Sequence, residues 1–293
     1  MSGLRRAVVV STGRNSAWVA LDGEASPRLA QLRRMSGPRS MPVPGDVVDV
    51  RILEDDRTVV DNVRPRVFSL ERQSVDGRRK TIAANVDLLV TVTALANPPP
   101  RLTTLDQLLA FAERADLEAL VLLTKPDLAG PAQIEALGTL YRGLGYRTVV
   151  CNPKAGVGID ELRAAIHGRR ALLAGVSGVG KSTIFRALGG DSAVGEVSRR
   201  GLGRQTTSAA RLYRMGDGFL IDSPGVSEFG LGKLDAEELA AGFREIGALH
   251  GTCRFADCTH IQEPGCAVLE ALQAGRIGES RYASYRKILL EPS

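Results

Sequence analysis

The most specific chemical signal is a glycine-rich segment that reads GVSGVGKST at residues 175–183. It fits the pattern GxxxxGK[ST] of a phosphate-binding loop, and it lies between an apolar run and a helix-like segment, as that motif requires. Glycines let backbone N–H groups curl around phosphate oxygens, and a helix N-terminus attracts the anion. We therefore expect Lys181 to reach the β- and γ-phosphates and Ser182 to bind Mg²⁺. The expected phosphate-binding residues are Gly175, Val176, Ser177, Gly178, Val179, Gly180, Lys181, Ser182 and Thr183.

Two further segments could complete a triphosphate site. About forty residues on, a strand-like run ends in Asp222-Ser223-Pro224-Gly225, where Asp222 would approach Mg²⁺ through water and the Gly225 N–H the γ-phosphate. DSPG alone is a common turn, so it indicates a nucleotide site only in combination with the phosphate loop. Residues 195–210, GEVSRRGLGRQTTSAA, are typical of a switch segment or of an ordinary surface loop. Thr206 or Thr207 would bind Mg²⁺, and the catalytic group stays open among Lys181, Gln205, Thr206 and Thr207.

A base-reading segment precedes the phosphate loop. The apolar run LEALVLLT is followed by KPD, which gives Thr124-Lys125-Pro126-Asp127. A carboxylate accepts two N–H groups on the edge of guanine, an arrangement that adenine does not present, and the Lys125 stem can lie along the base. Alone, a strand end before a proline turn produces such tetrads readily. Together with the phosphate loop, the tetrad predicts GTP over ATP.

Three cysteines and a histidine crowd into a short C-terminal segment, as Cys253-x4-Cys258-x-His260-x5-Cys266. Three thiolates and an imidazole are typical of a closed, tetrahedral, structural zinc site. Free thiols or a redox pair are the alternatives. The spacing favours one zinc ion per chain.

These motifs need a scaffold that brings strand ends together. From residue 86, apolar strands such as VDLLVTVTAL alternate with amphipathic segments such as TTLDQLLAFAERAD, which predicts a mostly parallel sheet covered on both faces. Such sheets bind ligands at the carboxyl ends of their strands. Chain order therefore does not matter for the site, and the reversed order of the motifs indicates a circular permutation.

The N-terminal seventy residues have another character. Four runs (RRAVVVSTG, NSAWVALDG, GDVVDVRILEDD and RTVVDNVRPR) contain about five short strands, and they predict a small closed barrel of the OB-fold type. Residues 1–80 carry 15 Lys and Arg against 10 Asp and Glu, whereas residues 81–293 carry 23 of each. A basic module on a neutral body suggests a polyanionic partner, although a solvated arginine-rich surface is an equal alternative.

The resulting prediction is an α/β protein with flanking modules. We expect an OB-fold domain over residues 1–70, a linker over 71–85, a circularly permuted P-loop GTPase domain in three α/β/α layers over 86–232, and a helical zinc-binding domain over 233–293. The sequence has no run of 18 apolar residues and a poor candidate signal peptide. We therefore expect a cytoplasmic protein without membrane contact.

At this point the sequence resembles the bacterial circularly permuted GTPases of small ribosomal subunit maturation, the small-ribosomal-subunit-dependent GTPase A family. TKPD, GVSGVGKS, GRQTTS, DSPG and the Cys/His pattern carry this resemblance, which covers nearly the whole chain. It implies an OB-fold domain, a zinc-bearing C-terminal domain, and GTP hydrolysis stimulated by the 30S subunit, with a checking or release role late in assembly. The expected partners are GTP or GDP, the 30S subunit and its 16S rRNA, the expected cofactors are Zn²⁺ and Mg²⁺, and we expect a monomer.

The sequence departs from this family at two places, Gln205 and residues 150–158, and a third position, Val226, differs from GTPases in general. Gln205 stands where the family often has histidine, and it could orient water but could not act as a base. In VCNPKAGVG (150–158), Pro153 has no N–H for the base, so Cys151 or Asn152 must supply that contact or it is lost. Val226 follows DSPG where many GTPases have a water-orienting glutamine, which predicts slow turnover without the ribosomal subunit.

Two other functions stay open at this stage. A nucleotide-controlled RNA-binding factor that hardly hydrolyses GTP agrees with Val226 and Gln205. An ATP-dependent enzyme, such as a small-molecule kinase, is disfavoured by Asp127. Both GTP-binding hypotheses require that Asp127 and the loop around Lys181 meet at one nucleotide.

Overall fold

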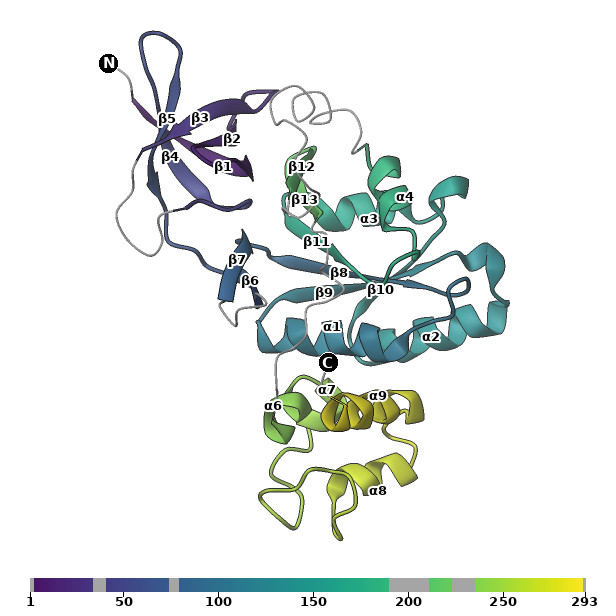
Figure 1. Cartoon of the computed structure of the whole chain (residues 1–293). Helices are drawn as coiled ribbons and strands as arrows, with labels where there is room; N and C mark the ends of the chain where they lie inside the picture. The colour runs from purple at the N-terminus through teal and green to yellow at the C-terminus, as the bar shows by residue number, and fades with distance from the viewer. Residues whose placement is uncertain (1–2, 34–40, 74–78, 190–210, 223–234, 292–293) are drawn as a thin grey trace. The chain divides into compact units, whose positions relative to one another are not determined.

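The structure is a computed structural model of the whole chain, and it describes residues 3–33, 41–73, 79–189, 211–222 and 235–291 (Figure 1). It divides into two compact units, and each is described by itself. The first comprises residues 1–87, 163–172 and 185–224, and the second comprises residues 88–162, 173–184 and 225–293.

A closed five-stranded barrel forms the N-terminal part of the first unit. Its strands are β1 (Leu4–Thr12), β2 (Ser16–Leu21), β3 (Arg28–Leu32), β4 (Val47–Ile52) and β5 (Thr58–Val63), in the order β1-β2-β3-β5-β4. Only the β3–β5 pair is parallel. Alternate positions of these strands point inward, as period-2 alternation requires, and fill the barrel with Ala7, Val9, Ala17, Val19, Leu21, Ala30, Val48, Val50 and Val60. The predicted OB-type barrel is confirmed.

The segment between the barrel and the main sheet has structure of its own. Strands β6 (Ser69–Gln73) and β7 (Arg79–Ala84) form a two-stranded antiparallel sheet. This sheet overlaps residues 71–85, where the sequence predicts a linker.

Three strands at one side of the main sheet come from later in the chain. Strands β12 (Arg211–Met215) and β13 (Gly218–Asp222) pair antiparallel, and β13 also pairs parallel with β11 (Arg170–Ala174).

The main sheet has six strands in the order β10-β9-β8-β11-β13-β12. Its strands β8 (Leu88–Ala94), β9 (Glu118–Thr124) and β10 (Arg147–Cys151) run parallel. All seven residues of β8 are buried, as expected for a parallel strand covered on both faces. Figure 1 shows α1 (Leu102–Arg114) and α2 (Pro131–Gly143) on one face, and α3 (Ile159–Ile166) and α4 (Lys181–Ala187) on the other. The three-layer α/β/α prediction is confirmed.

The C-terminal part is helical. It comprises α6 (Ala236–Ala241), α7 (Arg244–Gly247), α8 (Ala267–Gln273) and α9 (Glu279–Leu290), and α9 packs against α1. A capping box, in which Asp235 and Glu238 satisfy each other's backbone N–H groups, begins α6. The core of this part contains Leu239, Phe243, Ile246, Val268, Ala271, Ile277 and Tyr285. Among the helices that the structure describes, none has the length and apolar composition needed to cross a membrane.

Candidate nucleotide site and metal centre

The phosphate-binding loop connects β11 to α4, and its glycines are needed for its shape. Gly175, Gly178 and Gly180 have φ angles of +151°, +80° and +101°, which side chains rarely adopt. A Cβ atom on Gly175 would also lie 2.2 Å from the carbonyl oxygen of Val92. The glycines of the sequence pattern are therefore required by the backbone conformation and close packing of this turn.

Lys181 begins α4 and folds back over the loop. Its Nζ donates hydrogen bonds to the carbonyl oxygens of Gly175 at 2.6 Å and Val176 at 2.9 Å. Ser182 and Thr183 follow it in the first turn of the helix, so the phosphate-binding set predicted from sequence lies on one loop and one helical turn. Lys181 could exchange its carbonyl partners for phosphate oxygens, with which an ammonium makes stronger, charge-assisted hydrogen bonds.

The base-reading tetrad lies at the end of β9 and is fixed to the phosphate loop. The Thr124 hydroxyl donates to the carbonyl oxygen of Val179 at 2.7 Å. Lys125 adopts a left-handed backbone conformation with φ 58°, and its Nζ donates to the carbonyl oxygen of Asn97. The turn η1 (Pro126–Leu128) follows and leaves the Asp127 side chain exposed. Thr124 thus sets the distance between base and phosphate loops.

One cavity of about 240 Å³ joins these segments. Its lining comes from Asn97, the base-reading segment 124–128, the 152–154 segment, and the phosphate loop with the first turns of α4. The lining residues are Asn97, Thr124, Lys125, Asp127, Leu128, Asn152, Pro153, Lys154, Val179, Gly180, Thr183 and Ile184. Asp127 and the loop that leads into Lys181 therefore share one cavity despite their reversed order in the chain. The parallel sheet explains this, because the carboxyl ends of β9, β10 and β11 lie at the same edge.

The two candidates for the second base contact differ in accessibility. The Cys151 side chain is fully buried at the end of β10, and burial raises the pKa of its thiol to about 11. Asn152 is partly exposed and lines the cavity, and its side-chain Nδ2 donates to Asp127 Oδ1 at 2.9 Å. The structure therefore brings Asn152 and Asp127 together and leaves the Cys151 side chain outside the cavity.

The other residues expected at Mg²⁺, the γ-phosphate and the attacking water follow α4 in the chain. Asp222 is the last residue of β13, paired in register with Arg211. Gln205, Thr206, Thr207, Gly225 and Val226 lie outside the described residues.

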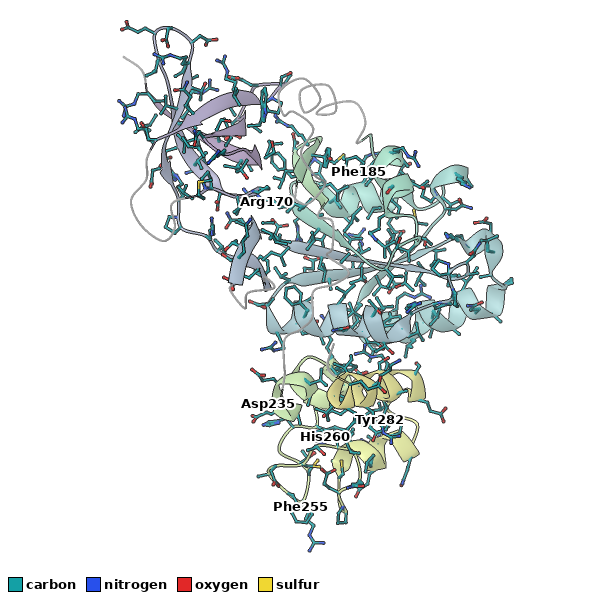
Figure 2. The ribbon with its side chains drawn as sticks, viewed as in Figure 1. Arg170, Phe185, Asp235, Phe255, His260 and Tyr282 are labelled. Carbon is teal, nitrogen blue, oxygen red and sulfur yellow. The ribbon has the colours of Figure 1, made fainter. Side chains whose placement is uncertain are left out.

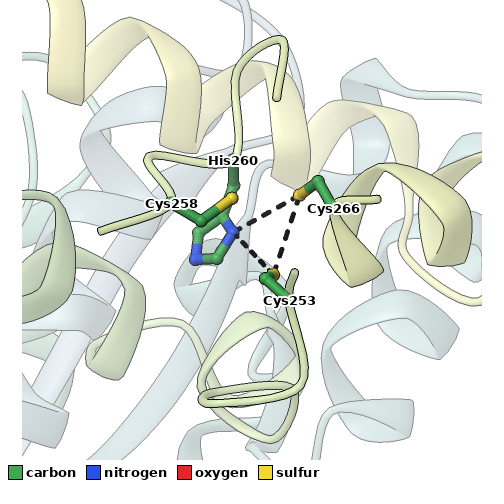
Figure 3. A group of neighbouring side chains, drawn as sticks. All are labelled: Cys253, Cys258, His260 and Cys266. Carbon is green, nitrogen blue, oxygen red and sulfur yellow. Dashed lines mark hydrogen bonds between the residues drawn. The ribbon is translucent and has the colours of Figure 1, made fainter. Parts of the chain in front are cut away.

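The predicted metal ligands are gathered into one cluster (Figure 3). The ligand atoms of Cys253, Cys258, His260 and Cys266 all lie within 4.8 Å of one another. His260 Nδ1 lies 3.6 Å from Cys253 Sγ and 3.5 Å from Cys266 Sγ, and the two sulfurs are 3.9 Å apart. A tetrahedral zinc ion with ordinary bond lengths would set about 3.6 Å between sulfur and nitrogen and about 3.8 Å between sulfurs. The four residues therefore fit a metal ion of this geometry.

Hydrogen bonds from neighbouring residues hold the cluster loop. The hydroxyls of Tyr282 and Tyr285 on α9 donate to the carbonyl oxygens of His260 and Thr259 at 2.8 and 3.0 Å; Tyr282 and His260 are labelled in Figure 2. Burial alone would raise the pKa of Glu263, but hydrogen bonds from the Thr259 hydroxyl and from backbone N–H groups outweigh it and lower that pKa to about 2. The loop is thus ordered by an ionised carboxylate and by α9.

Sequence reasoning did not identify a buried ionic cluster that joins the C-terminal helices to α1 and α2. Arg281 on α9 is fully buried, and it donates to Asp106 on α1 at 2.5 Å and to Glu245 on α7 at 2.7 Å. The Tyr141 hydroxyl on α2 donates to the same Asp106 oxygen at 2.8 Å. The only signal in the sequence is an aspartate on the apolar side of a helix, and it gives no partner.

Comparison with known proteins shows to which family this chain is related. Residues 63–232 match the family model described as RsgA GTPase. The chain is 46% identical to the small ribosomal subunit biogenesis GTPase RsgA of Pseudomonas aeruginosa over 232 residues, which cover 77% of this chain and 68% of that protein. It is 40% identical to the protein of that name from Moorella thermoacetica over 253 residues, or 85% of this chain and 84% of that protein.

Solved structures match over almost the full length. YjeQ from Thermotoga maritima aligns with a TM-score of 0.80 and 31% identity, covering 99% of this chain and 98% of that one. YloQ, described as a circularly permuted GTPase, aligns with a TM-score of 0.77 and 23% identity over 99% and 95% of the two chains, a similarity that concerns the fold alone. The permuted arrangement inferred from the motif order is therefore confirmed.

Proposed function

The chain belongs to the RsgA GTPase family and is a GTPase, and we propose that it hydrolyses GTP during late maturation of the 30S ribosomal subunit. The observation that carries this proposal is the cavity in which Asp127 and the phosphate loop meet. The names of the relatives supply the ribosomal context, which the site alone would not indicate. A nucleotide-controlled binding factor without hydrolysis is not favoured by this family membership.

The nucleotide would lie with its base against Asp127 and its phosphates against the loop. The two carboxylate oxygens of Asp127 accept the two N–H groups of guanine, and Thr124 holds that loop at a fixed separation from Val179. Lys181 then turns from its carbonyl partners to the β- and γ-phosphates. This division of labour places base selection on β9 and charge stabilisation on α4.

Magnesium would be held at the start of α4. We assign its ligands to Ser182, to Asp222 through water, and to Thr206 or Thr207. When bound, Mg²⁺ neutralises charge on the β- and γ-phosphate oxygens. Lys181, Gln205, Thr206 and Thr207 stay the candidates for completing the catalytic site, and the apolar side chain of Val226 has no polar group with which to orient the attacking water. Slow turnover in isolation is the consequence.

We assign zinc to the Cys253–Cys266 cluster, with a structural role. All four positions of a tetrahedral site are supplied by protein, so no position stays open for a reacting water. Zinc would favour thiolates over the neutral thiols; without it, burial raises the pKa of Cys258 to about 12. The ion would cross-link a loop that has little apolar core of its own.

We propose three working modules, with an OB-fold over residues 1–70, the GTPase over 86–232 and the zinc domain over 233–293. The barrel would contact 16S rRNA, but most of its described arginines are already neutralised. Ion pairs at 2.6–2.8 Å join Arg5 and Arg28 to Glu24, Arg51 to Asp61, Arg64 to Asp49 and Arg66 to Asp46. The exposed Arg6 and Arg14 are therefore the better candidates for phosphate contacts on the described surface. We also propose that the protein acts as a monomer in the cytoplasm.

The test is single-turnover GTP hydrolysis titrated with purified 30S subunits. We expect slow hydrolysis by the protein alone and a saturable acceleration by the subunit, with 50S subunits as the control. Full-speed hydrolysis without subunits, or no acceleration at saturating 30S, would contradict the proposed role. Competition by ATP equal to that by GTP would contradict the base assignment.

A further inference from the structure

The segment after β10 uses up its own backbone donors. The N–H of Asn152 donates to the Val157 carbonyl at 3.0 Å, and the N–H of Val157 returns to the Asn152 carbonyl at 3.1 Å. The N–H groups of Ala155 and Gly156 donate to the carbonyls of Asn152 and Pro153 at 3.1 and 3.4 Å. Lys154 N–H donates to Asn152 Oδ1 at 3.2 Å. Within residues 152–157, all of which the structure describes, no backbone N–H is left for a ligand.

This tight turn has a consequence for how guanine can be read. Asp127 would take the N1–H and the 2-amino group, and the adjacent O6 carbonyl needs a donor if the base is to be bound without loss. Pro153 has no N–H, and Cys151 keeps its buried side chain out of the cavity. A donor to O6 from this wall of the cavity must therefore come from a side chain.

Asn152 has a donor in the right place. Its amide orientation is fixed chemically, because the carboxylate of Asp127 only accepts hydrogen bonds and Lys154 N–H only donates. Nδ2 therefore faces Asp127 at 2.9 Å, and it carries a second hydrogen for a neighbouring acceptor. We propose that the Asn152 side-chain amide both orients Asp127 and donates to the O6 carbonyl of guanine, replacing a backbone contact.

Lys154 is the competing donor, since it also lines the cavity. Its side chain is exposed, and fixing a long, flexible lysine chain on the base costs rotamer entropy. The Asn152 amide is already held by two hydrogen bonds and loses little freedom when guanine binds. Preorganisation therefore favours Asn152.

This inference rests on the proposed guanine site, and nucleoside diphosphates can test the two separately. The full-length protein would be titrated with GDP, IDP, 6-thio-GDP and ADP in competition with a fluorescent GDP. IDP lacks the 2-amino group that Asp127 accepts, and 6-thio-GDP replaces O6 by sulfur, a weaker acceptor. The variants are Asn152→Ala, Asn152→Ser and Lys154→Ala, with Asn15→Ala, an exposed barrel asparagine, as the matched control.

Wild-type protein should prefer GDP to 6-thio-GDP by roughly 3- to 10-fold, the worth of one neutral hydrogen bond. Asn152→Ala should reduce this preference to about 1 and also weaken the preference over IDP, because Asp127 loses its partner. Asn152→Ser has one donor hydrogen in place of two. It should therefore retain either the preference for GDP over 6-thio-GDP or the preference for GDP over IDP, but not both. The Lys154→Ala and Asn15→Ala variants should keep both.

Three results would overturn the inference. Equal weakening of all three guanine-type ligands in Asn152→Ala would reduce the residue to a structural role. Retention of both preferences in Asn152→Ser would do the same. If Lys154→Ala were the only variant to lose the preference for GDP over 6-thio-GDP, the donor to O6 would be Lys154. If wild-type protein bound ADP as tightly as GDP, the guanine site itself would fail, an outcome distinct from these three.

Discussion

Replacing Arg281 with methionine is expected to loosen the C-terminal helices from α1. The guanidinium is fully buried, contacts Asp106 at 2.5 Å and Glu245 at 2.7 and 3.2 Å, and lies 4.4 Å from the centre of the Phe243 ring. Methionine keeps the packing volume but leaves two buried carboxylates without a cation. Removing one partner of a buried ion pair costs about 3–5 kcal/mol, so the free energy of opening α9 should fall by that amount.

Hydrogen exchange of peptides from α9 measures this free energy directly, and Trp18 fluorescence does not, because the only tryptophan lies in the barrel. A loss of 3–5 kcal/mol corresponds to exchange about two to four orders of magnitude faster if α9 opens locally. Arg286→Met, an exposed arginine on the same helix, is the matched control and should leave exchange nearly unchanged. Exchange in Arg281→Met within tenfold of wild type would refute the reasoning.

The same variant should show a distinctive pH dependence. Burial raises the pKa of Asp106 although Arg281 opposes the rise, and methionine removes this opposition. A raised folded-state pKa adds stability that is complete below the unfolded pKa of about 3.9 and is lost as pH rises through the folded value. The free energy of opening α9 should therefore fall further below the wild-type value at pH 8 than at pH 5.5 when Arg281 is replaced by methionine. A deficit that grows on acidification would contradict this account.

Three further variants test the nucleotide and metal sites. Asp127→Asn replaces an acceptor by a donor, so GDP should bind at least about tenfold more weakly and xanthosine diphosphate should gain affinity in competition titrations; unchanged GDP binding would remove Asp127 from the site. Gly175→Ala should abolish nucleotide binding because its Cβ would meet the Val92 carbonyl at 2.2 Å, whereas Gly130→Ala has open space and should bind normally. Cys258→Ser should lose the one zinc per chain found by metal analysis, and Cys151→Ser should keep it; equal zinc in both would refute the cluster assignment.

The sequence by itself determined the parts of this protein that depend on local chain geometry. A phosphate loop needs glycines at fixed positions within nine residues, because the backbone must take φ angles that other residues avoid. Four metal ligands within fourteen residues can surround an ion with one loop. Strand and helix periods, read locally, predicted the barrel and the parallel sheet for the same reason.

Only the tertiary structure decided which distant residues meet. The sequence left open whether Cys151 or Asn152 supplies the second base contact or whether that contact is lost. The structure adds that the Cys151 thiol is buried and that Asn152 donates a hydrogen bond to Asp127, and our proposal for Asn152 is built on these two observations. The pairing of Asp106 with Arg281, 175 positions later, could not be read locally, because a buried charge is tolerated only where another element supplies its counter-charge. Local conformation is set by each residue and its neighbours, whereas compensation of buried polar groups is set by packing.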